Sequence, residues 1–386
     1  MGSERLAQNS NLLTPQPCQL VIFGAPGDLA WRKLLPAVYN LNVDGALPSH
    51  FAVMGFGLPA EGKVEGDPDA FLRKRARAGI ERFSRQPLDE SHWEDFSRAL
   101  FFVPGRFDDA KAYEQLKARL ETVDQQFGIP GARVYYLAVP PQLVGMCVAH
   151  LKNTGLIRPA SELQSFSRVI VEKPIGRDLE SAQQVIQTVG QAFEESQTYR
   201  IDHYLGKETV QNLLVLRFAN SIFEPLWNTK YIDHVQITVA EEEGLVQYQP
   251  ETGKVTGSRV GYYEGVGALR DMVQNHMLQV LCMVCMEPPW SLMPDVVRDA
   301  KSGVLNCLRP MLPSDIESNV VRGQYIEGDM FGKRVPGYRK EVRDAFAAMG
   351  KPLTTEAMNS TTETYLAMKL YIDNWRWSGV PFYLRT

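Results

Sequence analysis

The amino-acid sequence predicts an α/β fold, in which a doubly wound domain with a parallel sheet is followed by an α+β domain with an antiparallel sheet. Short apolar segments alternate with amphipathic helical patterns as far as residue 202, which is typical of a parallel sheet covered by helices on both faces. A glycine-containing turn follows the first apolar segment directly. Beyond residue 202 the alternation stops, and strand and helix patterns are mixed.

The predicted strands of the first domain are short and apolar: residues 19–23, 51–55, 100–103, 133–139, 168–172 and 199–202. The predicted helices between them repeat apolar residues at helical spacing: residues 29–42, 69–82, 90–100, 109–127, 141–152 and 179–193. Pro36 lies within the first of these helices. Because proline breaks the interior of a helix, we expect the helix to kink or to begin again there.

The second domain has fewer recognisable elements. Helices are predicted at residues 207–219 and 268–286, an alternating strand at 231–240 and a final strand at 380–384. The polar, glycine-rich segment 244–261 is predicted to be an exposed loop. We therefore expect domains over residues 1–202 and 203–386.

Composition excludes several classes of protein. The net charge of −4 argues against non-specific binding to nucleic acid. The five scattered cysteines favour a reducing, cytoplasmic compartment. Cys282 and Cys285 have CxxC spacing but lie in an apolar helical run, so we interpret them as buried helix residues and expect no metal site. The sequence suggests neither a signal peptide nor a membrane-spanning segment.

The first candidate motif is the turn after the strand at 19–23, where a helix opens. Backbone amides at such a turn approach a pyrophosphate closely, and the helix N-terminus favours its negative charge. We therefore favour a nucleotide site over a mere tight turn. The motif comprises Gly24, Ala25, Pro26, Gly27, Asp28 and Leu29.

The second motif is Glu172-Lys173-Pro174, at the carboxyl end of a predicted strand. Such positions face the ligand crevice of an open α/β sheet, so Lys173 is a candidate for holding an anionic or hydroxylated substrate. The alternative is a surface lysine before a turn.

The third motif, residues 200–207, offers an imidazole, a hydroxyl and an ammonium within one turn, from His203, Tyr204 and Lys207. These groups suit a phosphate, although a solvated turn is an equal alternative. Asp202 and His203 are neighbours at a strand end, so we expect their side chains to diverge. That would leave Asp202 able to orient another group.

The fourth motif lies in the predicted helix at 268–286 and contains Asp271 and His276. The two residues are five apart, one more than the spacing that places side chains on one face of an α-helix. They need not share a face, but both can border a cleft. A structural role for the histidine is the alternative.

Together, in this order and spacing, these motifs resemble those of the glucose-6-phosphate dehydrogenase family. The segment RIDHYLGKE at 200–208 is the most specific, and the resemblance extends from about Cys18 to Thr386. It is carried by residues 24–37, 107–113, 135–141, 168–182, 200–212, 267–276 and 380–386.

The resemblance implies an oxidoreductase of glucose metabolism, in the oxidative pentose phosphate pathway. A hydride would pass from C1 of glucose 6-phosphate to NADP, giving the 6-phospho-lactone. The resemblance implies that His276 is the base and that Asp202 orients it. It also implies that His203, Tyr204 and Lys207 bind the substrate phosphate.

The remaining roles follow from the same resemblance. Sugar hydroxyls would be bound by Lys173, Glu241 and Asp271. Residues 1–202 would form a Rossmann-like dinucleotide-binding domain, and residues 203–386 a substrate-binding and catalytic domain. The cofactor would be bound by Gly24, Ala25, Pro26, Gly27, Asp28, Leu29, Arg32, Lys33 and Lys173.

Two positions near the cofactor depart from the family pattern. Pro26 stands where the family usually has Ser or Thr, and Leu58 where it has an Arg that meets the 2′-phosphate of NADP. Arg32 and Lys33 are candidates to compensate for the lost contacts. We expect NADP as the cofactor, with NAD as the alternative.

The family pattern also continues beyond Thr386, into a large antiparallel sheet that forms the interface of a homo-oligomer. We therefore expect a shortened chain, from which most of that interface is missing, and exposed strand edges at 231–240 and 380–384. Two alternatives remain open: an impaired fragment that binds cofactor or a partner without turnover, and a dehydrogenase of an unphosphorylated sugar.

Overall fold

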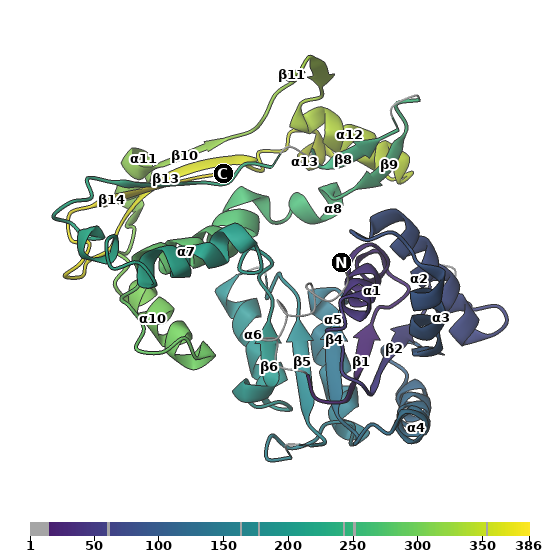
Figure 1. Ribbon diagram of the computed structural model, residues 1–386. Helices are drawn as coiled ribbons and strands as arrows, with labels where there is room; N and C mark the ends of the chain where they lie inside the picture. Colours follow the sequence, from purple (N-terminus) through teal and green to yellow (C-terminus); the bar gives the residue numbers. More distant parts are fainter. Residues whose placement is uncertain are drawn as a thin grey trace. The chain divides into compact units, whose positions relative to one another are not determined.

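The structure is a computed structural model (Figure 1) that describes residues 15–59, 62–162, 164–176, 178–241, 244–249, 252–352 and 354–386. The chain divides into two compact units. The first ends at Ile201 and the second begins at Asp202.

The first unit is built on a six-stranded, wholly parallel sheet (Figure 1). The strands are β1 (Cys18–Phe23), β2 (Phe51–Gly57), β3 (Leu100–Pro104), β4 (Arg133–Leu137), β5 (Ser167–Val171) and β6 (Thr198–Arg200). Their order in the sheet is β3-β2-β1-β4-β5-β6. The order reverses between β1 and β4, and ligands of doubly wound sheets bind at this point, beyond the carboxyl ends of the strands.

Helices cover both faces of the sheet, which confirms the predicted doubly wound fold. Val21 and Phe23 of β1 pack in one core with α4 and α5, whereas Ile22 packs in a second core with α1, α2 and α3. This alternation follows from the two-residue period of a strand. The helices are α1 (Leu35–Val43), α2 (Pro68–Phe83), α3 (Glu90–Arg98), α4 (Ala110–Phe127), α5 (Pro141–Asn153) and α6 (Leu179–Gly190).

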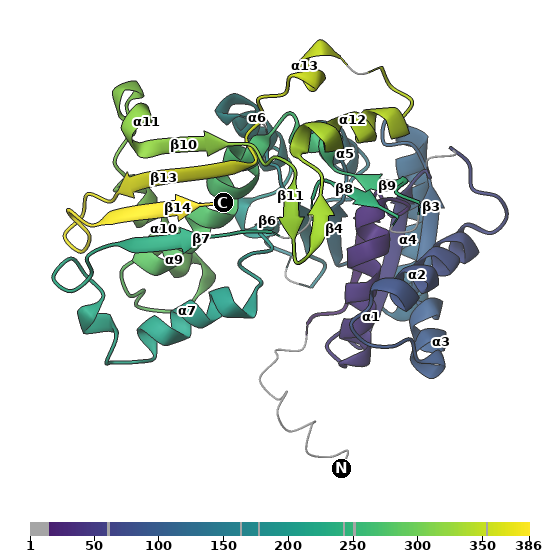
Figure 2. The ribbon, with the colours of Figure 1, turned by 90° about the horizontal axis from the view of Figure 1, so that it is seen from above.

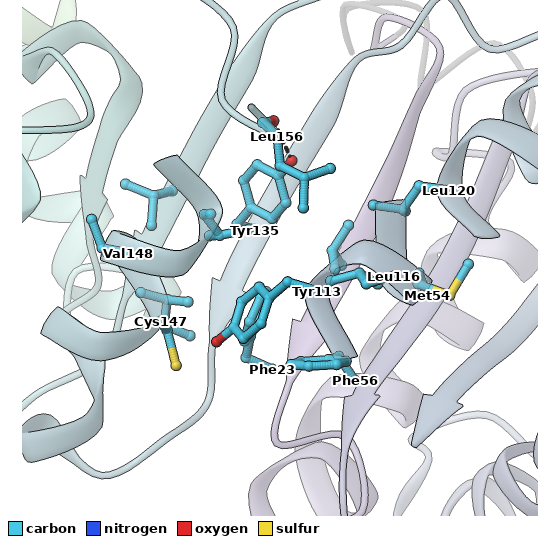
Figure 3. Close-up of a cluster of buried hydrophobic side chains, with 14 of the residues drawn as sticks. Phe23, Met54, Phe56, Tyr113, Leu116, Leu120, Tyr135, Cys147, Val148 and Leu156 are labelled. Atoms are coloured by element: carbon cyan, nitrogen blue, oxygen red, sulfur yellow. Dashed lines mark hydrogen bonds between the residues drawn. The ribbon is translucent and has the colours of Figure 1, made fainter. Parts of the chain in front are cut away.

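The first of these cores is rich in aromatic side chains (Figure 3). The rings of Phe23 and Phe56 meet edge to face at 5.1 Å. The hydroxyl of Tyr135 is buried but donates a hydrogen bond to the carbonyl of Leu156 at 2.6 Å. That bond avoids the cost of about 1–3 kcal/mol for an unsatisfied buried polar group. The same core contains side chains of β1 and β4, the strands on either side of the point where the strand order reverses.

The predicted irregularity in the helix at Pro36 is confirmed. A π-helical segment, η1 (Ala30–Leu34), runs into α1, which begins at Leu35 and has Pro36 in its first turn. The chain is helical without a break from η1 into α1, so Pro36, which has no N–H to bond back to η1, marks the change from π-helical to α-helical hydrogen bonding.

The second unit contains a four-stranded sheet in the order β10-β13-β14-β7 (Figure 2). Its strands are β7 (Val235–Thr238), β10 (Val320–Gly323), β13 (Tyr365–Tyr371) and β14 (Pro381–Arg385). Two pairings are antiparallel, and β14 and β7 are parallel. Side chains from this sheet form a core with α7 (Glu208–Phe218), α9 (Leu278–Cys285) and α10 (Pro294–Asn306).

The other elements of the second unit are short. β8 (Val246–Tyr248) pairs with β9 (Val255–Ser258), and β11 (Gly328–Met330) with β12 (Lys333–Val335). The helices are α8 (Val260–Tyr263), the π-helical η4 (Leu269–Met277), α11 (Pro313–Asn319), α12 (Tyr338–Ala348) and α13 (Thr355–Met358). Single 3₁₀ turns are η2 (Glu195–Gln197) and η3 (Glu224–Leu226).

One buried cation joins α7 to α9. The guanidinium of Arg217 is fully buried and donates to the carbonyls of Met283 and Met286 at 2.8 and 2.9 Å. It also pairs with Glu224 at 3.2 Å. Since the last carbonyls of a helix have no partner within it, Arg217 satisfies the C-terminal end of α9 from another helix.

Three predictions for the second unit are wrong. Segment 244–261 is not a loop, because it contains β8 and β9, and its Leu245 and Val260 are buried. The strand predicted at 231–240 extends only over Val235–Thr238. The strand predicted at 380–384 exposes no free edge, because β14 lies between β13 and β7.

Cys282 and Cys285 are buried in α9, as expected from their apolar surroundings. Burial raises the pKa of the Cys282 thiol to about 11 and raises that of Cys285 well above its ordinary value. Over the described ranges, no helix has the length and apolar character needed to cross a membrane.

Candidate active site

The glycine turn lies where the strand order of the first sheet reverses. Gly24 has φ +84°, and a Cβ atom on it would lie 2.4 Å from the carbonyl oxygen of Ala138, which follows β4. The amide of Gly27 donates to the carbonyl of Gly24 at 2.8 Å. The turn therefore requires glycine at position 24 and presents its backbone at the start of a helix, where an anion is favoured.

Positive charge gathers beside this turn. Arg32 pairs with Asp28 at 2.7 Å. The guanidinium groups of Arg32, Arg75 and Arg82 lie 5.7, 5.6 and 6.0 Å from the ring centre of Trp31. Sequence reasoning named Arg32 but not the two arginines of α2, because only the packing of α2 against η1 brings them to the same indole.

The first unit also carries Lys173, two residues after the end of β5. The Lys173–Pro174 peptide bond is cis. The preceding residue, Glu172, accepts a short hydrogen bond from the hydroxyl of Tyr136. Lys173 thus follows the carboxyl end of its strand, as its sequence position predicts.

The second unit brings His276 against Asp202. Nδ1 of His276 lies 2.5 Å from a carboxylate oxygen of Asp202, and the imidazole is fully buried. Burial by itself would raise the pKa of Asp202, but hydrogen bonds from His276 and from the Tyr204 amide outweigh it, and the pKa is lowered. An ionised carboxylate at Nδ1 fixes the imidazole tautomer and orientation, as a general base requires.

The helix that carries His276 is π-helical over nine residues, Leu269–Met277. In such a helix the backbone bonds span five residues, so residues five apart approach the same face. Asp271 and His276 have this separation. In the structure Asp271 accepts a hydrogen bond from the Tyr262 hydroxyl at 3.2 Å, whereas His276 is buried against Asp202.

Tyr204 packs directly on the His276 imidazole. The two rings are stacked, with centres 4.2 Å apart and planes 20° apart. The Lys207 ammonium lies 3.6 Å from the centre of the same Tyr204 ring. The Tyr204 hydroxyl donates to Glu241 at 3.4 Å, and the side chain is almost fully buried.

His203 meets the His276 ring edge to face at 4.5 Å. The expected divergence of Asp202 and His203 is wrong, because both side chains contact this imidazole. The physical reason is that β6 ends at Arg200, so the two residues lie in a turn rather than a strand. A carboxylate oxygen of Asp202 and one ring nitrogen each of His203 and His276 all lie within 4.8 Å of one another.

Glu241 and Asp271 line a cavity of about 530 Å³ in the second unit. The sequence singled out neither Arg259 nor Tyr325, which also line it. The guanidinium of Arg259 lies 4.0 Å from Glu241. These additions come from β9, β10 and their neighbours, and because they lie far apart in the chain, no local spacing could have identified them.

Comparison with known proteins agrees with this geometry. The family model described as glucose-6-phosphate dehydrogenase, NAD binding domain, matches residues 21–212, and that of the C-terminal domain matches residues 214–386. Glucose-6-phosphate 1-dehydrogenase of Chlamydia pneumoniae is 43% identical over 373 residues, which are 96% of this chain and 67% of that protein. This chain belongs to the glucose-6-phosphate dehydrogenase family.

Other members of the glucose-6-phosphate dehydrogenase family are similarly related. Glucose-6-phosphate 1-dehydrogenase 2 of Mycobacterium bovis is 42% identical over 96% of this chain and 66% of its own length. The solved structure of the Mycobacterium avium enzyme matches with a TM-score of 0.73 and 33% identity, covering 96% of this chain and 69% of that one. The chain thus spans about two thirds of the length of these relatives.

Another solved family structure is described as glucose-6-phosphate dehydrogenase in complex with its substrate glucose-6-phosphate. It matches with a TM-score of 0.76 and 30% identity, over 96% of this chain and 69% of that one. Membership of the glucose-6-phosphate dehydrogenase family makes the cofactor a nicotinamide dinucleotide. Glycine at position 24 lets the turn lie against Ala138 with its backbone at the start of a helix, an arrangement that is compatible with a pyrophosphate.

We expect Gly24→Ala to weaken dinucleotide binding by about tenfold or more, because the added methyl collides with backbone and the left-handed φ disfavours any side chain. Affinity is measured by the fluorescence of the reduced dinucleotide. Gly45→Ala is the matched control, since Gly45 has φ +65° but nothing within 4 Å of a built Cβ. Equal affinities of the two variants would contradict a role of this turn in binding.

Proposed function

We propose that this chain oxidises D-glucose 6-phosphate at C1 to 6-phospho-D-glucono-1,5-lactone, with NADP as the hydride acceptor. The observation that carries the proposal is the buried His276–Asp202 pair, next to Tyr204 and Lys207, in a member of this family. The description of a solved relative in complex with glucose-6-phosphate supports the choice of substrate.

His276 is the base in this proposal. The C1 hydroxyl loses its proton as the hydride leaves, so a proton acceptor is required. When bound, the nicotinamide ring accepts the hydride. Nδ1 of His276 is held by Asp202, so Nε2 is the nitrogen that takes the proton. The carboxylate then stabilises the imidazolium, and its low pKa keeps it ionised for this role.

The substrate is held at both ends. His203, Tyr204 and Lys207 bind the phosphate, to which an ammonium and an imidazole form charge-assisted hydrogen bonds. Glu241 and Asp271 accept hydrogen bonds from sugar hydroxyls at the cavity, where Arg259 adds donors. Lys173 is the remaining residue that we propose to bind a sugar hydroxyl.

NADP is favoured over NAD by the charge near the turn. NAD-binding domains of this type carry an acidic residue at the end of the second strand, whereas β2 here ends in Gly57, followed by Leu58. Arg32, Arg75 and Arg82 provide positive charge near the turn for a ribose phosphate. These groups offset the contacts that Pro26 and Leu58 do not supply.

In this proposal the two parts of the chain bind different ligands. Residues 1–202 bind the dinucleotide, with Gly24 to Leu29, Arg32, Lys33 and Lys173 at the site, and residues 203–386 bind the sugar phosphate and carry the base. We place the reaction in the cytoplasm, as the first step of the oxidative pentose phosphate pathway.

Mixing the purified chain with glucose 6-phosphate should produce absorbance at the reduced-nicotinamide band. We expect kcat/KM to be higher with NADP than with NAD, and far lower with glucose than with its phosphate, because glucose lacks the charged group that Lys207 binds. Reduction of neither dinucleotide would contradict the proposal. A strong preference for NAD would overturn only the cofactor, and equal rates with glucose would indicate a dehydrogenase of unphosphorylated sugar.

His276→Asn should lower kcat by about 10²–10⁴-fold, because the base is removed while the buried site stays polar. The dissociation constant of the dinucleotide should stay close to that of the parent chain. His234→Asn is the control, since His234 is exposed in the same unit and contacts Asp233, Gln236 and Tyr383, to which the proposal gives no role. A near-normal kcat in His276→Asn would exclude this histidine as the base.

Lys207→Ala should raise KM for glucose 6-phosphate by roughly 10–100-fold and leave KM for glucose almost unchanged. The reason is that the substitution removes a charge-assisted hydrogen bond to the phosphate, which glucose does not have. Steady-state kinetics on the two sugars measures the difference. Lys230→Ala, which removes an exposed lysine of the same unit, is the control. Parallel changes on both sugars would refute the phosphate role of Lys207.

A further inference from the structure

Tyr204 contacts both His276, the proposed base, and Lys207, a proposed phosphate ligand. Its ring is stacked on the His276 imidazole at 4.2 Å and contacts the Lys207 ammonium at 3.6 Å. These two distances keep the ammonium within about 8 Å of the imidazole centre, close enough for a charge on one to act on the other. Nothing in the stated roles of the three residues requires this shared contact.

We infer that Tyr204 is a positioning residue through which phosphate bound at Lys207 promotes proton transfer to His276. The inference rests on the proposed function, since it concerns the base and the phosphate site of that reaction. It assigns the substrate phosphate a part in the chemical step, in addition to its part in affinity.

The physical reason is the sign of the charges. Proton transfer from the sugar creates an imidazolium, and a nearby ammonium opposes the formation of a second cation. A bound phosphate anion offsets the charge of Lys207 and removes this opposition. Phosphate occupancy therefore makes the imidazole a better proton acceptor when a phosphorylated sugar is present.

The Tyr204 ring is suited to hold the two groups at fixed places. It is only 5% exposed, and its hydroxyl donates to Glu241. Its backbone amide donates to Asp202 at 2.9 Å, and Asp202 holds the imidazole. The residue is thus fixed at its main chain, its ring and its hydroxyl, and aromatic faces attract a cation such as the Lys207 ammonium.

Other titratable groups near the proposed base also affect its proton affinity. Asp202 contacts His276 directly, and His203 meets it edge to face. Asp271 lies on the same π-helix, and Glu241 holds the Tyr204 hydroxyl. Lys301 of α10 is close enough to interact electrostatically with Asp202. Of these groups only His203 is assigned to the phosphate site, so a phosphate-dependent response reports the part of the site formed by Lys207 and His203.

The test follows the His276 ring by NMR as a function of pH, with and without saturating inorganic phosphate. It uses the full chain with no dinucleotide or sugar. The chain has six histidines, and the signal of His276 is identified as the one lost in His276→Asn. We expect phosphate to move the midpoint of this titration upward by roughly half a pH unit or more.

Matched variants separate the role of the ring from that of the charge. Tyr204→Phe keeps the ring, so it should keep the phosphate-dependent shift. Tyr204→Leu removes the ring, and Lys207→Gln removes the charge, so each should reduce the shift by at least half. Unchanged signals of His50, His92, His150 and His234, which have no part in the proposed site, verify the fold. If the leucine variant does not fold, Tyr204→Met, which keeps unbranched apolar bulk, takes its place.

A shift in the parent chain that survives in Tyr204→Phe and is lost in the variants without the ring or the charge supports the inference. No shift in the parent chain overturns it, and so does an equal shift without the ring. The measurement needs no turnover. A chain that shows the shift but reduces no dinucleotide would therefore contradict the proposed function and leave the coupling intact.

Discussion

The contact between His276 and Asp202 is the interaction on which the chemistry proposed for the second unit depends. It brings together residues 74 positions apart, and it keeps a carboxylate ionised in a place where burial alone would favour the neutral acid. Tyr204 and His203 can then pack on a single imidazole orientation.

Local regularities in the sequence were sufficient to predict the first unit. Apolar strands such as 51–55 and the glycine turn repeat at spacings set by strand and helix geometry, and the packed sheet reproduces them. Prediction was poorer where tertiary contacts decide structure. Segment 244–261 is polar enough to resemble a loop, yet buried Leu245 and Val260 hold it as strands and a helix.

The candidate site shows the same contrast between what local sequence patterns predict and what tertiary contacts decide. Residue types and motif order identified Asp202, His203, Tyr204, Lys207 and His276, and the structure brings them together. The stacking of Tyr204 on His276 could not be read from the sequence, because it requires a turn in place of a strand end. Nor could the π-helical hydrogen bonding of Leu269–Met277, since a π-helix has no simple residue pattern.

The buried Arg217 has a consequence for which sugars fit. Lys207 immediately precedes α7, and His276 lies just before α9, while Arg217 ties these two helices together without solvent access. The distance between the Lys207 ammonium and the His276 imidazole is therefore set when the unit folds. In the proposed reaction this fixed distance selects substrates by their length. A phosphosugar with a different number of carbon atoms between its phosphate and its reacting hydroxyl would place that hydroxyl out of reach of the base.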